Sequence, residues 1–472
     1  MPDQWNEEAT RKQFIDKLLI RSGWKPITAY TDGRTYSLGA VEEYPTTSGP
    51  LDYLLFSSGR PLAAVEGKKV AVGPQNVLRQ AERYARSLED SPFQFNGYHA
   101  PFAYSTNGLV IWFRDLRHPL NLSREIAQLH TPAALEELLV KDEEKAKAWL
   151  KSNEVKLNPL RPYQKEAIES IEQSLFNRKR QMLVAMATGT GKTFMTVNLI
   201  YRLIKSGVAK RILFLVDRRA LAAQAVRELA SFEAEPGQKF DKIYEVYSQR
   251  FRREDVEGEP FDPKVLPSSY LTDPQSGLAF VYVCTIQRMR INLFGKEGMF
   301  GRRSGDLDEE EDADKLDIPI HAFDLVIADE CHRGYTSQEE SKWREVLNHF
   351  DAVKVGLTAT PAAHTVSYFK EVAYRYDYEQ AIQEGYLVDY DAIAIHSEIT
   401  VNGAFLQQGE EVGIRNTETG QLVFDTLEDE RELPPETDET ECTAPDRNRK
   451  IVRELKKYLL EQESVRGIFK KP

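Results

Sequence analysis

Apolar residues in the second half of the chain gather in short, unbroken runs separated by helical patterns. The runs are QMLVAMA, RILFLV, FVYVC, FDLVIAD and AVKVGLTA, all downstream of residue 157. Helices are predicted over residues 161–178 and 192–206. Strands without a polar face need cover on both sides, so this pattern predicts an α/β fold with a parallel sheet between two helical layers.

The first 120 residues show a mixed pattern. An amphipathic helix is predicted from an N-cap at Asn6 to Gly23, and a second helix begins near Pro74. Strands are predicted over residues 51–56 and 61–68, joined by the turn SSGR, and on both sides of the Thr-Asn-Gly turn in PFAYSTNGLVIWF. These elements indicate a separate α/β unit.

A chain of 472 residues is too long for one hydrophobic core, so several domains are expected. The Ala-, Glu-, Lys- and Leu-rich stretch 132–151 is predicted to be a connecting helix, and a last helix is predicted over 446–462. The predicted divisions are a first domain over 1–130, a helical linker over 131–156, a parallel-sheet domain over 157–395 and a tail of hairpin, acidic linker and helix over 396–472.

Composition indicates a globular protein of a reducing compartment. Hydrophobic residues make up 41% of the chain, which is ample for burial. Three cysteines, Cys284, Cys331 and Cys442, form no pairing pattern. The start has no apolar signal region and no apolar run reaches membrane-spanning length, so we expect a cytoplasmic protein without a membrane partner.

The net charge of −12 does not exclude a nucleic-acid partner, because it is concentrated in two stretches. Residues 306–317 hold eight acids and one lysine, and residues 425–441 hold nine acids and one arginine. Both are expected to be solvated loops. The remainder is close to neutral, so local basic surfaces are possible.

The segment MATGTGKT, residues 186–193, follows a predicted strand and opens a predicted helix. In that context glycines let backbone N–H groups close around phosphate oxygens, and the helix N-terminus adds its positive end. Lys192 is expected to reach the β- and γ-phosphates and Thr193 to hold Mg²⁺. Met186 replaces the first glycine of the general pattern. The other predicted ATP-binding residues are Thr188, Gly189, Thr190 and Gly191.

The segment VIADECH, residues 326–332, ends another strand run. Asp329 at the strand's end could join the coordination of Mg²⁺, and Glu330 could orient the attacking water. A lone Asp-Glu pair is usually ordinary surface. Paired with the glycine-rich loop in one parallel sheet, it indicates ATP hydrolysis.

Six motifs in order resemble the first lobe of superfamily 2 helicases and translocases: LRPYQKEAI, MATGTGKT, LVDRRALAAQA, TIQRM, DECHRGY and GLTATP. The resemblance implies that Gln164 contacts adenine and that His332 ends the Asp-Glu-x-His box. It also implies that Thr358, Ala359 and Thr360 couple hydrolysis to movement on DNA. The family's second lobe, with its arginine finger, is expected where this chain stops, so the chain is expected to hold half a motor.

The hairpin around SSGR carries acids that could bind a second metal. If residues 56 and 61 face each other, residue 52 lies opposite roughly residue 65, which puts Asp52 beside Glu66. Glu66 and Lys68 project from the same strand face. Paired carboxylates repel unless a cation lies between them, and Mg²⁺ takes such ligands. A lysine beside the metal could stabilise the pentavalent phosphate. The alternative is an ordinary amphipathic hairpin.

Two neighbouring features give this hairpin a resemblance to the PD-(D/E)xK nuclease core. NEEATR opens the first helix with acids, of which Glu7 matches the family's upstream acid, and Gln80 and Tyr84 form the downstream Q-x-x-x-Y helix. Leu51 stands where the family has proline before Asp52. The resemblance implies a PD-(D/E)xK endonuclease domain over 1–130.

A nuclease of this type ahead of a superfamily 2 motor resembles the R (motor and restriction) subunit of type I restriction enzymes. The resemblance implies an ATP- and Mg²⁺-dependent enzyme that pulls double-stranded DNA past a complex with methylation and specificity subunits and cuts it at a distance. The alternative is a repair or antiphage helicase whose nuclease-like domain is inactive and binds DNA. An ATP-dependent protein remodeller is less well supported.

Basic residues at the starts of predicted helices are candidates for DNA contacts. They belong to the segments DRRALAAQ and TIQRMR, where helix N-termini could meet phosphates. The candidate DNA-binding residues are Arg218, Arg219, Arg288 and Arg290. The alternative is that these are solvated surface arginines.

Overall fold

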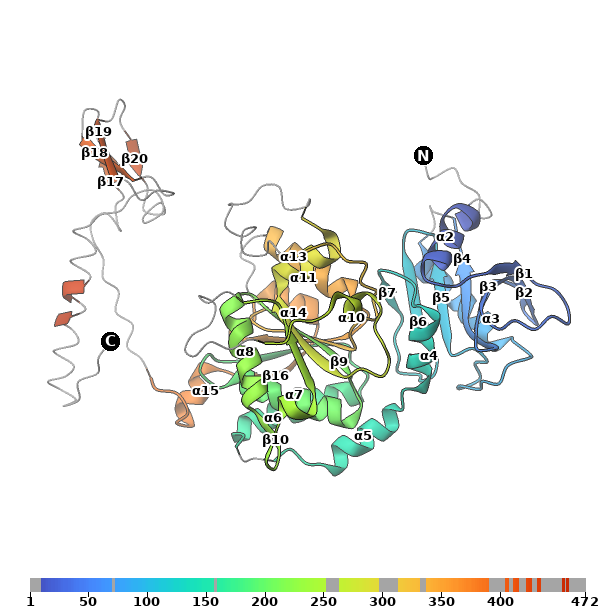
Figure 1. Cartoon of the computed structure of the whole chain (residues 1–472), viewed down its shortest axis with the longest axis horizontal. Helices are drawn as coiled ribbons and strands as arrows, with labels where there is room; N and C mark the ends of the chain where they lie inside the picture. Colours follow the sequence, from blue (N-terminus) through green and yellow to red (C-terminus); the bar gives the residue numbers. More distant parts are fainter. Residues whose placement is uncertain are drawn as a thin grey trace. The chain divides into compact units, whose positions relative to one another are not determined.

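The computed structural model of the chain divides into two compact units, residues 1–387 and 388–472 (Figure 1). The described site residues lie in the first unit. The structure describes residues 10–69, 73–156, 159–251, 263–296, 313–331, 337–389, 404–406, 411–415, 422–426, 431–433, 452–454 and 456–457.

The first domain is built on a seven-stranded sheet whose strands follow their order along the chain. The pairs β1–β2 and β4–β5 are parallel, and the other neighbours are antiparallel. The strands are β1 (Ile27–Ala29), β2 (Gly39–Thr46), β3 (Gly49–Ser57), β4 (Arg60–Gly67), β5 (Phe102–Thr106), β6 (Ile111–Asp115) and β7 (Arg124–Ile126).

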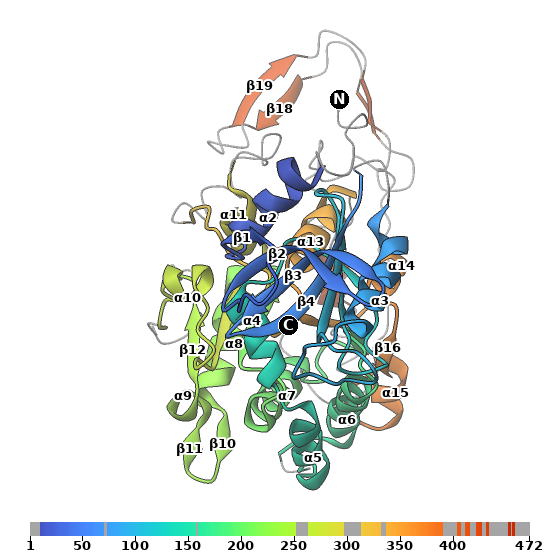
Figure 2. The same cartoon turned by 90° about the vertical axis from the view of Figure 1, so that its right-hand side faces the viewer.

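Two hydrophobic cores flank this sheet. Ile15, Leu19 and Leu135 join one core, and Leu78 and Tyr84 join the other. The helices α2, α3 and α4 that supply most of them are labelled in Figure 2. The helices that supply these residues are η2 (Arg11–Ile15) continuing into α2 (Asp16–Arg21), α4 (Pro132–Val140), and η3 (Pro74–Val77) continuing into α3 (Leu78–Arg86).

The hairpin predicted around SSGR is formed by β3 and β4. Ser58 and Gly59 occupy its turn with φ of 51° and 74°, left-handed values that a two-residue turn of this kind requires. Phe56 pairs with Pro61 as expected, but the register shifts between Leu55 and Phe56. The shift changes which residues meet at the far end of the hairpin.

Tyr53 pairs with Val65, which brings Asp52 level with Glu66. The sequence-based register placed residue 52 opposite roughly residue 65, one position off. A bulge cannot be read from the alternation of polar and apolar residues here, because both strands are buried along most of their length. This shift of the register by one residue favours the predicted proximity of Asp52 and Glu66.

The stretch 132–151 forms two helices, which corrects the prediction of a single connecting helix. Asp142 separates α4 from α5 (Glu143–Ser152) and caps α5 by accepting a hydrogen bond from the Lys145 N–H at 2.9 Å. Leu135 of α4 packs in the first domain, and Leu150 of α5 packs in the second. The boundary between the cores of the two domains therefore lies at the junction of these helices.

The second domain contains a seven-stranded sheet in the order β12-β13-β9-β14-β15-β8-β16. All neighbours in it are parallel, as the apolar runs predict. The strands are β8 (Gln181–Met186), β9 (Arg211–Val216), β12 (Glu245–Ser248), β13 (Phe280–Thr285), β14 (Leu325–Ala328), β15 (Val353–Thr358) and β16 (Val372–Tyr376).

Helices pack on both faces of this sheet and form two cores. On one face lie α6 (Pro162–Phe176), α7 (Lys192–Ser206), α8 (Arg219–Ser231), α9 (Phe240–Ile243) and α15 (Tyr378–Gln383). On the other lie α10 (Ser268–Thr272), α11 (Ile286–Phe294), α13 (Ser337–His349) and α14 (Ala363–Phe369). A short hairpin joins β10 (Glu233–Glu235) to β11 (Gln238–Lys239).

The edge strands β12 and β16 are absent from the sequence-based prediction. Their residues are only partly buried, in contrast to the fully buried β9 and β13. An edge strand does not need the continuous apolar run by which the central strands were recognised.

The described tail consists of short pieces. Of the last predicted helix, residues 452–454 and 456–457 are described and helical. The strands are β17 (Ala404–Leu406) paired with β20 (Arg431–Leu433), and β18 (Glu411–Arg415) paired with β19 (Leu422–Thr426). Among the helices of the described residues, none has the length and apolarity needed to span a bilayer.

Candidate functional site

The predicted phosphate loop is the turn between β8 and α7. Gly189 and Gly191 have φ of 84° and 77°. A Cβ on Gly191 would also come within 2.6 Å of the Gln164 Nε2, so this position needs glycine for two reasons. The loop leads into the N-terminus of α7, whose backbone N–H groups suit an anion.

Two neighbouring side chains of α6 form hydrogen bonds to the backbone of this loop. The Tyr163 hydroxyl and the Gln164 Nε2 both donate to the Thr190 carbonyl at 2.9 Å, and Nε2 also donates to the Gly191 carbonyl at 3.2 Å. The Gln164 Oε1 accepts from the Arg161 N–H at 3.0 Å. Gln164, predicted to contact adenine, therefore also holds the phosphate loop in place.

Lys192 lies at the first position of α7 and is buried. Its Nζ donates to the Met186 carbonyl at 3.3 Å and lies 3.7 Å from the Glu330 Oε1. Thr193 is half-buried and Thr188 is exposed. The loop thus combines a buried cation with a threonine hydroxyl next to it, as phosphate and Mg²⁺ binding require.

The predicted hydrolytic acids follow β14. The Glu330 N–H donates to the Asp329 Oδ1 at 2.9 Å, and Glu330 has a left-handed φ of 51°. Burial first, and then the neighbouring Glu330 carboxylate, raise the pKa of Asp329 to about 6, although Lys192 opposes this shift. A carboxylate so poorly solvated is stabilised by a cation, which fits a role in holding Mg²⁺.

The predicted coupling segment follows β15, the strand between β14 and β8. The Thr358 hydroxyl accepts from the Thr360 N–H at 3.1 Å and lies 3.1 Å from the Thr360 carbonyl, which closes a turn with Ala359 at its tip. The Cys331 N–H donates to the Leu357 carbonyl at 3.2 Å. The hydrolytic and coupling segments are therefore in direct contact.

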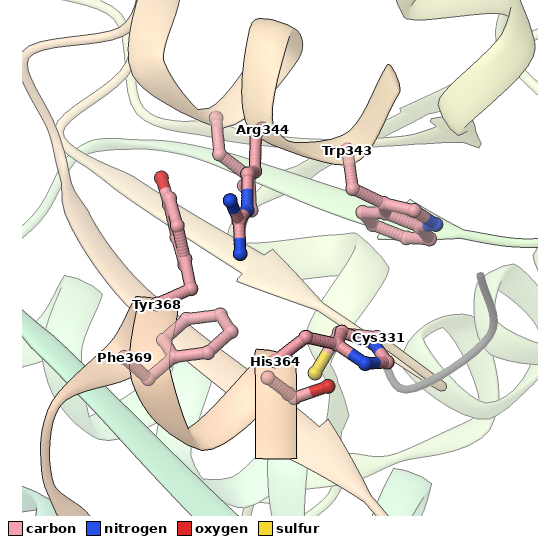
Figure 3. A pocket seen from close by; sticks show the side chains of 8 residues that line it. Cys331, Trp343, Arg344, His364, Tyr368 and Phe369 are labelled. Atoms are coloured by element: carbon pink, nitrogen blue, oxygen red, sulfur yellow. The ribbon is translucent and has the colours of Figure 1, made fainter. Parts of the chain in front are cut away.

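A small pocket lies beside these segments (Figure 3). The Cys331 Sγ donates to the Leu357 carbonyl at 3.4 Å, and burial raises the pKa of its thiol. The thiol is therefore held in its unreactive, protonated form. The lining residues are Cys331, Trp343, Arg344, Leu347, His364, Thr365, Tyr368 and Phe369.

In the first domain, both carboxylate oxygens of Asp52 are bonded. Oδ1 accepts from the Arg11 Nη1 and Oδ2 from the Gly67 N–H, each at 2.7 Å. Gly67 follows Glu66, so this contact ties Asp52 to the strand end that carries the second acid. Arg11 also pairs with Glu43. Sequence reasoning assigned no role to Arg11, although it ends the NEEATR motif that suggested the nuclease.

Glu66 is buried and pairs with Lys68, whose Nζ lies 3.0 Å from its Oε1. Lys68 follows Gly67, the last residue of β4, so the two side chains meet at the end of the strand, whereas the sequence predicted one strand for both. On the other side, β5 runs parallel to β4, with Ser105 paired with Glu66 and the Thr106 carbonyl accepting from the Lys68 N–H at 2.9 Å. The site therefore lies where two parallel strands end.

Gln80 and Tyr84 lie one turn apart on α3, with 3.5 Å between Nε2 and the hydroxyl. Tyr84 is buried in the core that includes Leu54 and Ala64, residues of the hairpin strands. α3 therefore packs on the strands that carry the acids, and its Q-x-x-x-Y side chains face one another.

The carboxylates of the first domain fit Mg²⁺ binding if waters and phosphate oxygens supply the remaining ligands. Asp52 and Glu66 supply carboxylate oxygens, and Arg11 and Lys68 supply compensating positive charge. In the described part of the chain no group of three or more His, Cys, Asp or Glu side chains gathers as a metal site. Mg²⁺ commonly completes its octahedron with waters and phosphate oxygens, so two carboxylates are sufficient.

The predicted DNA-binding arginines differ in exposure. Arg218 has 71% of its side chain exposed. Arg219 is buried and donates to the Arg250 carbonyl at 2.5 Å, and Arg288 is also buried. Arg290 pairs with Glu345 at 3.1 Å. Only Arg218 of the four presents a largely exposed guanidinium. Glu7 and His332, the remaining predicted site residues, lie outside the described residues.

Two family descriptions match the chain. "Type I restriction enzyme EcoKI endonuclease subunit second domain" matches residues 30–139, and "Type III restriction enzyme, res subunit" matches residues 157–363. The first match falls in the domain that carries Asp52 and Glu66. The second spans the phosphate loop, the hydrolytic acids and the coupling segment.

Relatives of this kind match over most of the chain. The chain is 31% identical, over 96% of its length, to the type I restriction enzyme EcoKI endonuclease subunit of Escherichia coli (strain K12). It is 27% identical, over 82% of its length, to the EcoAI endonuclease subunit of Escherichia coli. The chain covers 41% and 43% of these relatives, less than half of each.

Among solved structures, the type ISP restriction-modification enzyme LlaBIII bound to DNA is similar at 21% sequence identity. The similarity covers 49% of this chain and 16% of that chain, with a TM-score of 0.34.

Proposed function

This chain belongs to the endonuclease subunits of type I restriction enzymes, and from that membership we propose that it carries the DNA-cutting domain and the first motor lobe of such a subunit. Residues 157–395 would hydrolyse ATP to move double-stranded DNA, and residues 1–130 would cut it. The observation that carries the proposal is the presence, in separate domains of one chain, of a phosphate loop facing two acids and a hairpin with an Asp, Glu and Lys.

In the motor lobe, the residues on α6 and α7 would bind the nucleotide. Lys192 neutralises charge on the β- and γ-phosphates, and Gln164 contacts adenine while holding the loop. Thr193 and Asp329 would hold Mg²⁺, which screens the phosphate charge when bound. Glu330 lies close enough to Lys192 to orient a water toward the terminal phosphate.

In the nuclease domain, Asp52 and Glu66 would hold Mg²⁺, which lowers the pKa of a bound water when present. Lys68, already within 3.0 Å of Glu66, would stabilise the negative charge that develops on the attacked phosphate. Arg11 holds the Asp52 carboxylate in place. Glu7, Gln80 and Tyr84 would support the site and position DNA.

The partners of this subunit would be double-stranded DNA and the methylation and specificity subunits of the same system. Those subunits would select the DNA sequence, so this chain needs only contacts that are independent of sequence. Arg218, at the start of α8, is the residue best placed for a phosphate contact, because its side chain is exposed beside a helix N-terminus.

One observation favours a second candidate, a motor with an inactive nuclease-like domain that only binds DNA. Both oxygens of Asp52 are already bonded within the protein, one of them to a guanidinium that competes with a cation. Cleavage of circular DNA by the complete subunit, assembled with its partners, separates the two. The proposed enzyme cuts when both ATP and Mg²⁺ are supplied, whereas the alternative hydrolyses ATP and leaves the circle intact.

A further inference from the structure

The first domain contacts the motor lobe at the amino-terminal ends of the motor strands. Arg180 precedes β8, Arg211 begins β9 and Asp351 lies just before β15. All three bond to residues of the first domain or to each other. The ATP loop and the hydrolytic acids lie at the opposite, carboxyl ends of these strands, so the two functional regions lie at opposite edges of one sheet.

Asp351 is the centre of this contact and is buried. Arg124 of β7 donates two hydrogen bonds to its carboxylate, from Nε to Oδ1 at 2.6 Å and from Nη2 to Oδ2 at 2.7 Å. The His130 Nε2 lies 2.9 Å from Oδ2, and the Arg180 Nη2 lies 2.8 Å from Oδ1. One carboxylate of the motor lobe thus holds two first-domain residues and one arginine of its own lobe.

The contact continues into both domains through hydrogen bonds and strands. The His130 Nδ1 lies 2.8 Å from the Tyr104 hydroxyl on β5. The next residue of β5, Ser105, pairs with the proposed metal ligand Glu66. In the other direction, β15 leads from the Asp351 end of the sheet to the coupling segment that begins at Thr358. Asp351 is therefore connected through β15 to the coupling segment, and through His130, Tyr104 and β5 to the proposed nuclease site.

Two further contacts between the domains, and one within the first domain, support this attachment. Arg211 makes a bidentate pair with Glu137 of α4, with both distances at 2.9 Å. Ile320, which precedes β14, is buried in a core of the first domain. The Trp24 Nε1 donates to the His130 carbonyl at 2.8 Å, which fixes the backbone of the histidine. The domains share a buried surface rather than a flexible tether.

The charges at this contact depend on a single anion. Arg124, Arg180 and Lys354 lie around the buried Asp351 side chain, and Arg124 and Arg180 keep 20% and 36% of their own side chains exposed. Burial alone would raise the pKa of Asp351, but Arg124 and Arg180 outweigh it and hold that pKa well below its usual value. Without the carboxylate, Arg124 of one domain and Arg180 of the other would repel each other at a half-buried contact. Asp351 is the buried member of this cluster, so removing its charge should cost more than removing one partner of a surface pair.

We propose that Asp351 is a positioning residue that holds the nuclease domain on the motor lobe as one rigid body, and that cutting after ATP-driven movement depends on this attachment. The inference rests on the proposed function. A nuclease fixed to the lobe that moves along DNA keeps a constant place relative to the DNA path, whereas a detached nuclease does not.

The test uses the complete subunit assembled with its methylation and specificity subunits. ATP turnover and cleavage of circular DNA are measured in one preparation, and cuts per ATP hydrolysed are compared. Asp351→Asn is expected to lower this ratio by at least roughly tenfold, because it leaves the guanidinium groups of Arg124 and Arg180 facing each other without the carboxylate between them. A second variant, Asp351→Asn with Arg124→Met, removes the repulsion and is expected to recover part of the loss.

A matched control is the buried, bidentate pair of Glu172 and Arg202, which lies within the motor lobe at 2.6 and 3.0 Å. Glu172→Gln removes a comparable charge without touching the first domain, so cuts per ATP should stay near wild type. An unchanged ratio in Asp351→Asn, or an equal fall in Glu172→Gln, overturns the proposal. If wild type itself hydrolyses ATP without cutting, the proposed function fails instead.

If Asp351→Asn does not fold, the variant Tyr104→Phe tests the proposed attachment instead. It removes one hydroxyl that bonds to His130 and leaves the ring in place. Cuts per ATP should fall about fivefold, the equivalent of one hydrogen bond, with ATP turnover within about twofold of wild type. A wild-type ratio in a variant with wild-type ATP turnover would contradict the proposal.

Discussion

Lys192 and Glu330 approach each other across the carboxyl edge of the motor sheet, with 3.7 Å between Nζ and Oε1. The strands that precede them in the sequence, β8 and β14, are separated in the sheet by β15. The parallel order of the sheet therefore brings a candidate phosphate-binding cation to a candidate hydrolytic acid, although 138 positions separate them in the sequence.

Lys192→Ala in the complete subunit should abolish ATP turnover, by at least about a hundredfold, because the phosphate charge loses its buried counter-charge. DNA cleavage should be lost with it. Lys205→Ala is the control on the same helix, since Lys205 pairs with Glu235 on the surface. Cleavage that persists in Lys192→Ala would mean that cutting does not depend on the motor.

Gln164→Ala should raise the KM for ATP by about tenfold or more, because the loop carbonyls of Thr190 and Gly191 lose their donor and adenine loses a contact. Gln173→Ala is the matched control, as Gln173 lies on the same helix and is exposed. Steady-state ATPase measurements over a range of ATP concentrations check this. An unchanged KM would remove Gln164 from the nucleotide site.

The buried motor strands and the phosphate loop could be predicted from sequence, because a strand covered on both faces needs an unbroken apolar run and the loop needs its glycines. Edge strand β16 could not, since half-exposed strands carry no such run. The contact of Asp52 with Arg11 and the bulge in the hairpin could not be predicted from sequence either. They depend on packing between elements rather than on local pattern.

The attachment between the domains left no signal in the sequence. Arg180 ends the run Arg-Lys-Arg, Arg124 precedes Glu125, and Asp351 stands between Phe350 and Ala352. All three charges look like surface residues when read along the chain. Only the fold brings them together, with the Asp351 side chain buried between the two arginines. The predicted DNA-binding arginines illustrate the converse, since Arg219 and Arg288 look exposed in sequence and are buried.

Arg218→Ala should weaken DNA binding equally on all sequences and reduce the slope of affinity against salt by about one, as expected for one phosphate contact. Arg219→Ala should instead lower the stability of the lobe, because its buried guanidinium bonds to the Arg250 carbonyl. Binding measured on two unrelated sequences at several salt concentrations separates these effects. A loss confined to one sequence would contradict a backbone contact.

Lys354 should make stability depend on pH. Burial, followed by repulsion from Arg180, lowers its pKa to about 7, against 10.5 for the ordinary side chain, while Asp351 opposes the shift and Arg124 adds to it. Between these values the unfolded chain binds a proton that the folded chain does not, so this group makes the folded state more stable as pH rises from 7 toward 10.

Lys354→Met removes that dependence. Relative to wild type, the thermal midpoint of the variant should be highest near pH 6.5 and should fall back as the pH approaches 9. Lys370→Met serves as the control, because Lys370 is exposed. A difference between Lys354→Met and wild type that does not change with pH would contradict a lysine with a lowered pKa.

The central claim is that one chain contains two separate metal-dependent sites, one for DNA and one for ATP. Its most direct test is Asp52→Ala in the complete, assembled enzyme, with cutting of circular DNA and ATP turnover followed in the same preparation. Asp52→Ala removes a proposed Mg²⁺ ligand, and Lys68→Ala removes positive charge worth roughly 3–4 kcal/mol to the transition state. Glu136→Gln, which breaks a pair with Arg60 elsewhere in the same domain, is the control. We predict that both site variants stop cutting while ATP turnover stays near wild type. Normal cutting by Asp52→Ala would contradict the account.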